Sequence, residues 1–393
     1  MVGKKFLGWS MALFMTLGLA VACEKEGAAS SENGEIPTQS SSQSSVEQSD
    51  EPEASSSTPE ESGPEVEPEI KTNDEYIRVD ADGNVSPSGE YVLFGNYPQT
   101  KVTDEEILSV LNGQAGALPT SSDAGAWTSY EYRIGGGAKA DYMWYVDVET
   151  EDAKYRGVYF NRYHSPYGIK QDANQDDVGY ELETAYWFVY EPVKWKIVEK
   201  QDGKATLVCD MVIDGREFQD SYEEVEYEYN TWYTYNHDAP YNTWANNYEY
   251  SEIRAWLNDT FYETAFSTSQ QTIVVETTVK NDIETTEGND ENLIIEDFIC
   301  NDTVDKVWLL SYQEAYTYFN DGNSRAKKST DYAQCQGAYT QTASYSLGKA
   351  DWWIRSPYYW SPFASYIGWY GSCDGGKQVN ETCGVVPAVI ITL

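Results

Sequence analysis

Residues 351–357, Asp-Trp-Trp-Ile-Arg-Ser-Pro, and residues 384–391, Gly-Val-Val-Pro-Ala-Val-Ile-Ile, decide the fold of this chain. The first stretch has two tryptophans and a charge. The second is almost continuously apolar and β-branched, which is typical of a short strand that is covered on both faces. A chain whose last residues are this apolar folds its own terminus into its core. We therefore expect the two stretches to lie side by side in the dry centre of one globular domain.

The composition is strongly acidic and rich in aromatic residues. The 393 residues include 13 Trp, 33 Tyr and 11 Phe, and the formal net charge is −39. Nucleic-acid phosphates require a basic face, so this charge argues against a nucleic-acid partner. It equally disfavours a protein that lies flat on an anionic membrane surface. The length allows one or two domains once a leader and a linker are set aside.

The N-terminus has the pattern of an export signal. Two lysines precede an apolar run over residues 6–21, which is too short for a stable membrane-spanning helix. The run leads into Leu-Ala-Val-Ala-Cys at residues 19–23, which resembles a bacterial lipobox; the alternative is an ordinary secretory signal cleaved near Ala22. We predict that residues 1–22 are a lipoprotein signal peptide. Acyl chains such as palmitate on Cys23 would then hold the protein at the cell membrane, outside the cytoplasm.

A polar linker follows the leader. From residue 24 to about residue 72 the chain is mostly Ser, Glu, Pro and Gln, with almost no large apolar side chains. Such a segment cannot bury enough surface to offset its chain entropy. We predict a disordered acidic linker over residues 23–88, which lifts a single globular domain, residues 89–393, away from the membrane.

The rest of the chain has an α+β pattern. Apolar and polar residues alternate over residues 193–197, which predicts a half-buried strand, and Asp-Gly at residues 202–203 predicts a hairpin turn. Thr103, Ser267 and Ser311 are each followed three residues later by Glu or Gln, which predicts capping boxes at the starts of helices. Because no long βαβ alternation is present, we predict a mixed or antiparallel sheet with short helices. Further strands are expected at residues 91–95, 142–148, 155–160, 186–190, 205–208, 274–279 and 305–310, and a further helix from residue 251.

Eight short sequence motifs follow one another in a fixed order along this part of the chain. They are Pro-Val-Lys-Trp-Lys-Ile-Val (192–198), Thr-Trp (243–244), Ile-Arg-Ala-Trp-Leu-Asn (253–258), Phe-Tyr-Glu-Thr-Ala-Phe-Ser (261–267), Asp-Lys-Val-Trp-Leu-Leu-Ser (305–311), Thr-Asp-Tyr-Ala (330–333), Trp-Trp-Ile-Arg-Ser-Pro (352–357) and Gly-Val-Val-Pro-Ala (384–388). In this order they resemble the domain of unknown function 6273 family of bacterial surface proteins. The resemblance covers roughly residues 89–393, and segments 113–185 and 221–241 look like individual elaborations.

The resemblance implies a fold similar to the formylglycine-generating-enzyme branch of C-type lectin-like domains. In that fold, as in this sequence, a Trp-rich strand and a closing strand lie late in the chain. The family usually has Arg in the closing motif where this chain has Val386. If that Arg serves a shared binding site, this protein has lost it; if it pairs with a core acid, the loss is structural.

Aromatic segments are the first candidates for ligand recognition. The candidate residues are Trp232, Tyr233 and Tyr235 in a Tyr-rich stretch and Trp360, Tyr366 and Trp369 in a later loop. Aromatic rings offer flat faces to sugar rings while the sugar hydroxyls remain hydrated. The alternative is that these rings fill the core of a domain that is short of Leu and Ile.

Arg355 is a further candidate because it lies between Trp353 and Pro357. In the functional interpretation its guanidinium stacks on tryptophan and clamps an anion or a sugar hydroxyl. In the structural interpretation, which we favour, it is an interior arginine that is satisfied by a carboxylate or by backbone carbonyls.

A calcium-loop register begins at Asp172. Asn174, Asp176 and Glu183 occupy positions three, five and twelve of that register, and hard cations prefer such oxygen ligands. Asp177 stands where the register requires glycine, and acidic chains produce such matches by chance. Calcium is therefore the weaker of the two interpretations of this segment.

Five cysteines remain besides Cys23, so at least one is unpaired. Cys373 and Cys383 flank a Gly-rich turn and are the pair that we expect to form a disulfide. The alternative, which the family resemblance suggests, is that this pair binds copper. His164 and His237 are the only histidines, and on polar loops we expect both to be exposed.

Three functional hypotheses follow. The preferred one is a non-catalytic, lipid-anchored surface protein with a recognition or adhesion module that binds glycan or protein through aromatic loops. The second is a copper-dependent oxidase of the formylglycine-generating type. The third is a structural envelope protein without a specific small ligand. No combination of His with Ser or Cys indicates a catalytic triad.

Overall fold

The computed structural model describes residues 90–393 except 135–136, 166–173, 228–230, 289–295 and 374. The signal peptide, Cys23 and the linker that the sequence predicts lie outside these residues. In the described part of the chain, no helix has both the length and the apolarity to cross a membrane.

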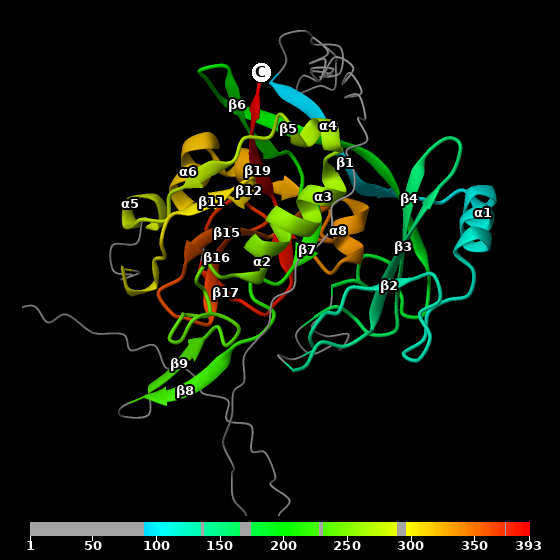
Figure 1. Cartoon of the computed structure of the whole chain (residues 1–393), viewed down its shortest axis with the longest axis horizontal. Coiled ribbons are helices and arrows are strands. Elements are labelled where there is room, and N and C mark those ends of the chain that lie inside the picture. Colours follow the sequence, from blue (N-terminus) through cyan, green and yellow to red (C-terminus); the bar gives the residue numbers. More distant parts are fainter. Residues whose placement is uncertain (1–89, 135–136, 166–173, 228–230, 289–295, 374) are drawn as a thin grey trace, which may run out of the picture. The chain divides into compact units, whose positions relative to one another are not determined.

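The larger sheet has eight strands in the order β12-β19-β6-β5-β4-β3-β2, with β1 paired to β5 (Figure 1). All its pairs are antiparallel. The Asp202-Gly203 turn joins β5 to β6 with positive φ at both residues, as expected for a tight hairpin. The strands are β1 (Tyr91–Lys101), β2 (Thr128–Ser129), β3 (Met143–Glu149), β4 (Lys154–Phe160), β5 (Tyr186–Gln201), β6 (Lys204–Cys209), β12 (Val307–Leu309) and β19 (Pro387–Thr392).

The smaller sheet has five strands in the order β17-β16-β15-β18-β7. They are β7 (Asp214–Arg216), β15 (Trp352–Pro357), β16 (Phe363–Ile367), β17 (Gly376–Gln378) and β18 (Cys383–Val385). Three further strand pairs are β8 (Glu223–Tyr227) with β9 (Thr231–Tyr235), β10 (Thr277–Val279) with β11 (Thr303–Asp305), and β13 (Lys327–Lys328) with β14 (Lys349–Ala350).

The described helices are short. They are α1 (Glu105–Ala115), α2 (Glu252–Trp256), a π-helical turn (Leu257–Phe261), α3 (Tyr262–Ala265), α4 (Thr268–Gln271), α5 (Ile283–Thr286), a 3-10 turn (Glu296–Phe298), α6 (Tyr312–Tyr318), α7 (Gly322–Arg325) and α8 (Asp331–Cys335). The capping boxes at Ser267 and Ser311 are confirmed. The one predicted at Thr103 is wrong: α1 is capped by Asp104, because its carboxylate already accepts the backbone N–H groups of Glu106 and Ile107. The α+β class, dominated by sheet with few short helices, is confirmed.

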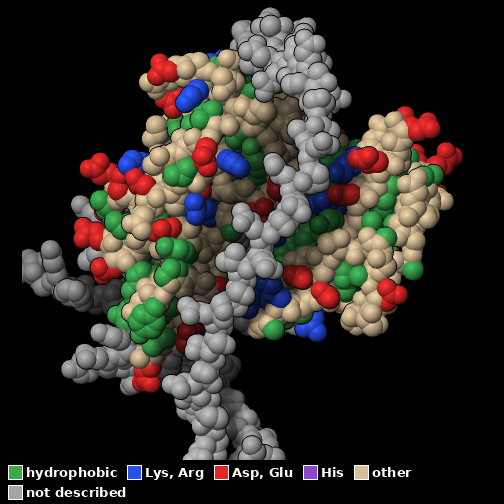
Figure 2. Space-filling view, viewed as in Figure 1, with side chains coloured by type: hydrophobic (Ala, Val, Ile, Leu, Met, Phe, Trp, Pro, Cys, Tyr) green, Lys and Arg blue, Asp and Glu red, His purple; other side chains and the backbone are tan. Residues whose placement is uncertain are grey.

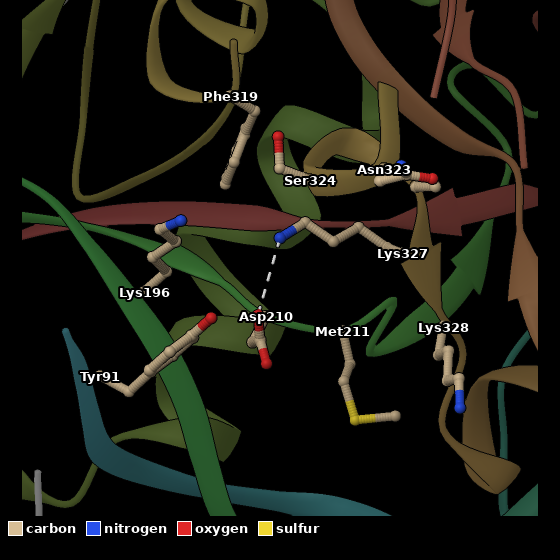
Figure 3. Close-up of a pocket in the computed structure, with 10 residues that line it drawn as sticks. Tyr91, Lys196, Asp210, Met211, Phe319, Asn323, Ser324, Lys327 and Lys328 are labelled. Carbon is tan, nitrogen blue, oxygen red and sulfur yellow. Dashed lines mark ion pairs between the residues drawn. The ribbon is translucent and has the colours of Figure 1, made fainter. Parts of the chain in front are cut away.

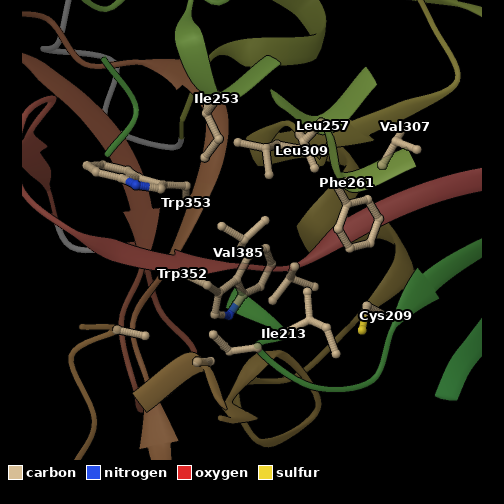
Figure 4. Packing of buried hydrophobic residues seen from close by; sticks show 14 of the residues in the cluster. Cys209, Ile213, Ile253, Leu257, Phe261, Val307, Leu309, Trp352, Trp353 and Val385 are labelled. Carbon is tan, nitrogen blue, oxygen red and sulfur yellow. The ribbon is translucent and has the colours of Figure 1, made fainter. Parts of the chain in front are cut away.

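The double-tryptophan stretch and the C-terminal stretch meet in the core, as predicted. β15 pairs in parallel with β18 at Trp352 and Gly384. The chain then passes through Val386 into β19 of the larger sheet, so the C-terminal stretch joins the two sheets. Both tryptophans are fully buried, and Figure 4 shows them close to side chains of β18 and α2. A Cβ at Gly384 would lie 2.4 Å from the Asp351 carbonyl oxygen, so this close pairing requires glycine.

The first strand is longer than the sequence predicts. The strand predicted over residues 91–95 continues beyond them as β1, which stays paired to β5 as far as Lys101. Two register irregularities, after Leu93 and after Pro98, let the strand bend without leaving the sheet. Pro and Gly in this segment therefore mark bulges of an edge strand and not its end.

Candidate functional site

A cleft of about 300 Å³ lies at the end of β7, beside α2. We call it the Arg216 cleft. Besides Arg216, the residues used below are Tyr130, Tyr132, Glu217, Asp220, Glu252 and Trp256. None of them was among the candidates predicted from the sequence, and the two tyrosines come from the segment 113–185 that looked like an individual elaboration.

Local folding places these side chains. Ser251 caps α2, which puts Glu252 in its first turn and Trp256 four residues later on the same helical face. Gly215 precedes Arg216 in β7, and a Cβ there would lie 2.6 Å from the backbone nitrogen of Ala338. The absence of a side chain at residue 215 therefore lets the chain after α8 pack against the strand that carries Arg216.

Arg216 has aromatic neighbours but no polar partner. Its guanidinium carbon lies 4.4 Å from the ring centre of Trp256, 5.2 Å from that of Tyr132 and 5.9 Å from that of Tyr130. Its Nε is buried without a hydrogen bond, and the guanidinium makes no ion pair with any residue that the structure describes. Cation–π contacts stabilise the charge but leave its N–H donors available to an acceptor.

His164 and Glu217 form an ion pair below the cleft. His164 is 1% exposed, so the prediction that it is exposed is wrong. Its Nδ1 donates to the Gln336 carbonyl oxygen at 2.7 Å, its Nε2 lies 2.6 Å from Glu217 Oε1, and its ring stacks on Tyr132 at 3.7 Å. Burial raises the pKa of Glu217, but the charge and hydrogen bond of His164 outweigh it, so the pKa is lowered and Glu217 is ionised.

Asp220 and Glu252 are two neighbouring acidic side chains at the cleft. The backbone N–H of Asp220 donates to Glu252 Oε2 at 3.2 Å. Burial, followed by the hydrogen bond and the charge of Asp220, raises the pKa of Glu252 to about 8. Glu252 is therefore protonated at neutral pH and can donate a hydrogen bond, whereas Asp220 Oδ1 lies 2.8 Å from Arg133 Nε.

The described acidic groups that lie close enough to share a metal ion are Asp220, Asp238 and Glu252, whose carboxylate oxygens are within 4.8 Å of one another. Arg133 pairs with the two aspartates, and Lys139 lies 3.8 Å from Asp220 and 3.9 Å from Glu252. Arg133 and Lys139 already supply positive charge to these three carboxyl groups, which weakens their attraction for a metal cation.

The predicted calcium loop is a different segment. Asp172 lies outside the described residues, and Asn174 Oδ1 accepts the backbone N–H of Thr340 at 2.7 Å. Asp176 and Glu183 are not part of the acidic group at the cleft. The calcium interpretation therefore stays a prediction.

The two predicted aromatic segments adjoin each other in part. Thr234 of β9 bonds to Ser361 Oγ through its backbone nitrogen at 3.1 Å and its hydroxyl at 2.7 Å, which brings the loop 358–363 to β9. Trp360 in this loop is 51% exposed and stacks on Phe363 at 4.9 Å. On β9, Tyr233 and Tyr235 pack on Trp244, while the Trp232 side chain lies outside the described residues.

Tyr366 and Trp369 belong to a separate part of the surface. Trp369 packs beside Tyr345 at 6.1 Å, and its backbone N–H donates to Asp351. Tyr366 has the Lys377 ammonium 5.1 Å from its ring centre.

In Figure 2, hydrophobic side chains gather at the lower left, toward the β8–β9 hairpin, while acidic side chains are spread over the rest of this face.

Arg355 is the interior arginine that the favoured interpretation described. It is 1% exposed and makes a bidentate pair with Glu314. Its other N–H groups donate to Asn281 Oδ1 and to the carbonyl oxygens of Leu309 and Lys280. All five donors are used, so none remains for a ligand.

Cys373 and Cys383 are free thiols in the structure, so the predicted disulfide is not formed. Burial raises the pKa of Cys373 to about 11 and that of Cys383 to about 12. Metals are bound by the thiolate, and these environments favour the neutral thiol at physiological pH. The site does not fit a copper centre.

Comparison with known proteins finds a family match in the second half of the chain. Residues 202–393 match the family described as Domain of unknown function (DUF6273). This match supports the resemblance drawn from the sequence for those residues, whereas the 192–198 landmark lies before it. No curated protein and no solved structure matches the chain. Arg216, Glu217, Asp220, Glu252 and Trp256 fall within the matched region, and Tyr130 and Tyr132 lie outside it.

Proposed function

We propose that the protein is a non-catalytic, lipid-anchored module outside the cytoplasm that recognises a glycan, and that the Arg216 cleft binds a short glycan terminus. The observation that carries the proposal is the guanidinium of Arg216, which faces aromatic rings and makes no hydrogen bond or ion pair with the described residues, although Asp214 and Glu217 are close enough for their charges to act on it. A partly buried charge without a polar partner is costly unless a ligand supplies one.

The polar groups of the cleft suit a sugar. Sugar hydroxyls both donate and accept hydrogen bonds, and the cleft offers both roles. The Nε1 of Trp256 is a second buried donor without a partner, and protonated Glu252 can donate as well. The carboxyl oxygens of Glu217 and Asp220 can accept. A volume of about 300 Å³ lies at the lower end of the range of small-ligand sites, which fits a glycan terminus better than a large cofactor.

A chain of contacts leads from the cleft to the exposed aromatic residues. Arg133 binds Asp220 at the cleft and also Asp238, which follows β9. Asn236, directly after β9, donates to Gln219 beside Asp220. Since β9 is bonded to the loop that carries Trp360, these contacts connect the cleft with exposed aromatic side chains.

An array of glycans probed with the full-length protein tests this proposal. We expect wild-type protein to bind a limited set of glycans and Arg216→Gln to lose most of that binding. Arg162→Gln is the matched control, because it removes the same charge from an exposed side chain. Binding of no glycan, together with tryptophan fluorescence that added sugars do not change, would favour a structural envelope protein. Equal binding by Arg216→Gln and wild type would remove the cleft as the site.

The proposal also includes a lipid anchor at Cys23 and a C-type lectin-like fold. Labelling of cells with a palmitate analogue is expected to mark the wild-type protein and to fail for Cys23→Ala. β15 and β18 both lie near the end of the sequence and pair with each other, which supports the proposed kinship with formylglycine-generating C-type lectin-like domains. An experimental structure whose strand order differs from that fold would contradict the kinship but leave the cleft in place.

A further inference from the structure

A second cavity, of about 340 Å³, lies on another part of the domain, and the residues that line it have a net positive charge. We call it the lysine pocket. Its lining includes Lys196 of β5, Lys327 and Lys328 of β13, and Asp210 after β6. Three lysines and one aspartate leave a formal excess of two positive charges. Such an excess is unexpected in a chain with 26 basic and 65 acidic residues.

Two of the lysines point into the same space. Figure 3 shows the ammonium groups of Lys196 and Lys327 turned toward one another across the cavity, with Phe319 above them. The ring centre of Phe319 lies 4.2 Å from Lys327 Nζ and 5.6 Å from Lys196 Nζ. The Lys328 side chain points away from this space in the same view.

The one carboxylate of the pocket does not neutralise them. Asp210 is shared, because its Oδ2 lies 3.3 Å from Lys194 Nζ and its Oδ1 lies 3.8 Å from Lys327 Nζ. The second distance is too long for a hydrogen bond. Lys196 makes no ion pair with the described residues. The pocket therefore holds ammonium donors whose hydrogen-bonding capacity the protein does not use.

The fold places the Lys327 side chain in surroundings that disfavour its charged form. Its side chain is only 4% exposed, and burial, which outweighs the charge of Asp210, lowers its pKa. The nearby charges of Lys194 and Lys196 lower it further. A bound anion would offset these effects, since it would supply a counter-charge to both converging ammonium groups.

The geometry points to a binding site for a phosphate group in the lysine pocket. Lysine acts as a compact point charge that suits the several oxygens of phosphate, whereas a planar carboxylate is better matched by the guanidinium fork of arginine, which does not line this pocket. Asn323 at the same cavity is a neutral polar residue whose side-chain N–H groups suit the remaining oxygens, whereas the Ser324 hydroxyl already donates to the Asp321 carbonyl oxygen at 2.8 Å. The phosphate is either a free ion or part of an ester on a small molecule or surface polymer. This inference is independent of the Arg216 cleft.

Calorimetric titration of the full-length protein with inorganic phosphate, at constant ionic strength, tests the inference. We expect saturable binding of one phosphate, weakened about tenfold or more in Lys196→Gln, since a hydrogen bond to a charged group is lost. Lys328→Gln removes an equal charge from a side chain that points away, and we expect it to retain wild-type affinity. Circular dichroism checks that both variants are folded.

Parallel titrations with glycerol 3-phosphate and with a poly(glycerol phosphate) distinguish the sources. Preference for the ester or the polymer assigns the pocket to esterified phosphate, and preference for the inorganic ion assigns it to free phosphate. No saturable binding of any of the three overturns the inference. It is equally overturned if Lys328→Gln loses as much affinity as Lys196→Gln, because binding would then reflect general charge and not the converging pair.

Discussion

Two arginines in the same domain have opposite surroundings. Arg355 of β15 is fully buried, and each of its five N–H groups has an acceptor in the protein. Arg216 of β7 is partly buried, lies over three aromatic rings and has no acceptor among the described residues. Both strands belong to the five-stranded sheet, so the sheet itself does not set the difference.

The comparison separates a structural charge from one that is available for binding. Asn281 belongs to one segment of the chain and Leu309 and Glu314 to another, and Arg355 binds to both. Arg216 is positioned by packing alone, which leaves its donors unused. Two acids whose charges act on Arg216 have other hydrogen-bond partners: Glu217 lies 2.6 Å from His164 Nε2, and Asp214 accepts from Tyr97 Oη and from the Gly215 backbone N–H. We infer that the first arginine contributes mainly to stability and the second mainly to binding.

The largest effect is expected for Arg355→Met. The change leaves Glu314 and two backbone carbonyls without their partner, and loss of one member of a buried ion pair typically costs about 3–5 kcal/mol. Denaturant unfolding of wild type and variant measures the difference in the free energy of unfolding. A loss below about 1 kcal/mol would break the comparison, because Arg355 would then not be the structural member of the pair.

Arg216→Met is expected to separate stability from binding. The free energy of unfolding should fall by only about 1 kcal/mol, the size of a partly exposed cation–π contact, while affinity for a glycan found on the array falls at least about tenfold. The same denaturant series and a binding titration measure both. If the variant unfolds as readily as Arg355→Met and binds normally, the assignments of the two arginines are reversed.

Glu217→Gln tests the ion pair that leaves Arg216 without a carboxylate. The pKa of Glu217 is lowered from its usual 4.5, so its contribution to stability is full above about pH 4.5 and is lost as the pH falls through the lowered value. We expect the variant to be less stable by about 1–2 kcal/mol at neutral pH and to lose less stability on acidification. Melting temperatures from neutral to acidic pH measure this. An unchanged acid slope would show that His164 does not hold Glu217 ionised.

The smallest effect is expected for Glu252→Gln. The pKa of Glu252 is raised from 4.5 to about 8, so the protonated form is favoured by the fold. Its contribution to stability is complete below about pH 4.5 and is lost as the pH rises through about 8. Glutamine does not ionise, so the variant should lose less melting temperature over this range than wild type. Parallel curves for the two proteins would show that Glu252 is ionised in the cleft at neutral pH.

The sequence predicted the centre of the fold better than its edges. The apolar C-terminus and the double tryptophan both have to be buried, and the structure pairs Trp352 with Gly384. The end of the first strand was predicted wrongly, because Gly95 and Pro98 signal a turn locally while pairing to β5 keeps the segment extended. Local propensity yields to strand pairing when a long partner strand is available.

The candidate site was harder to predict than the core. Arg355 was noticed because tryptophan and proline flank it, whereas Arg216 follows a glycine in a stretch without an obvious motif. One signal was present: Arg216 stands three residues after the apolar run Met-Val-Ile at residues 211–213. His164 was expected to be exposed because its neighbours are polar, and its burial depends on Tyr132 and Gln336, which lie far from it in the chain.

By itself, the amino-acid sequence determined the α+β class, the buried pairing of residues 352 and 384, two helix caps and the kinship of residues 202–393. These features depend on local periodicity, capping chemistry and the need to bury long apolar runs, all of which can be read along the chain. Only the tertiary structure decided which charged side chains are paired and which are free. Whether an arginine is satisfied depends on acceptors from distant segments, and the order of residues along the chain does not specify those distances.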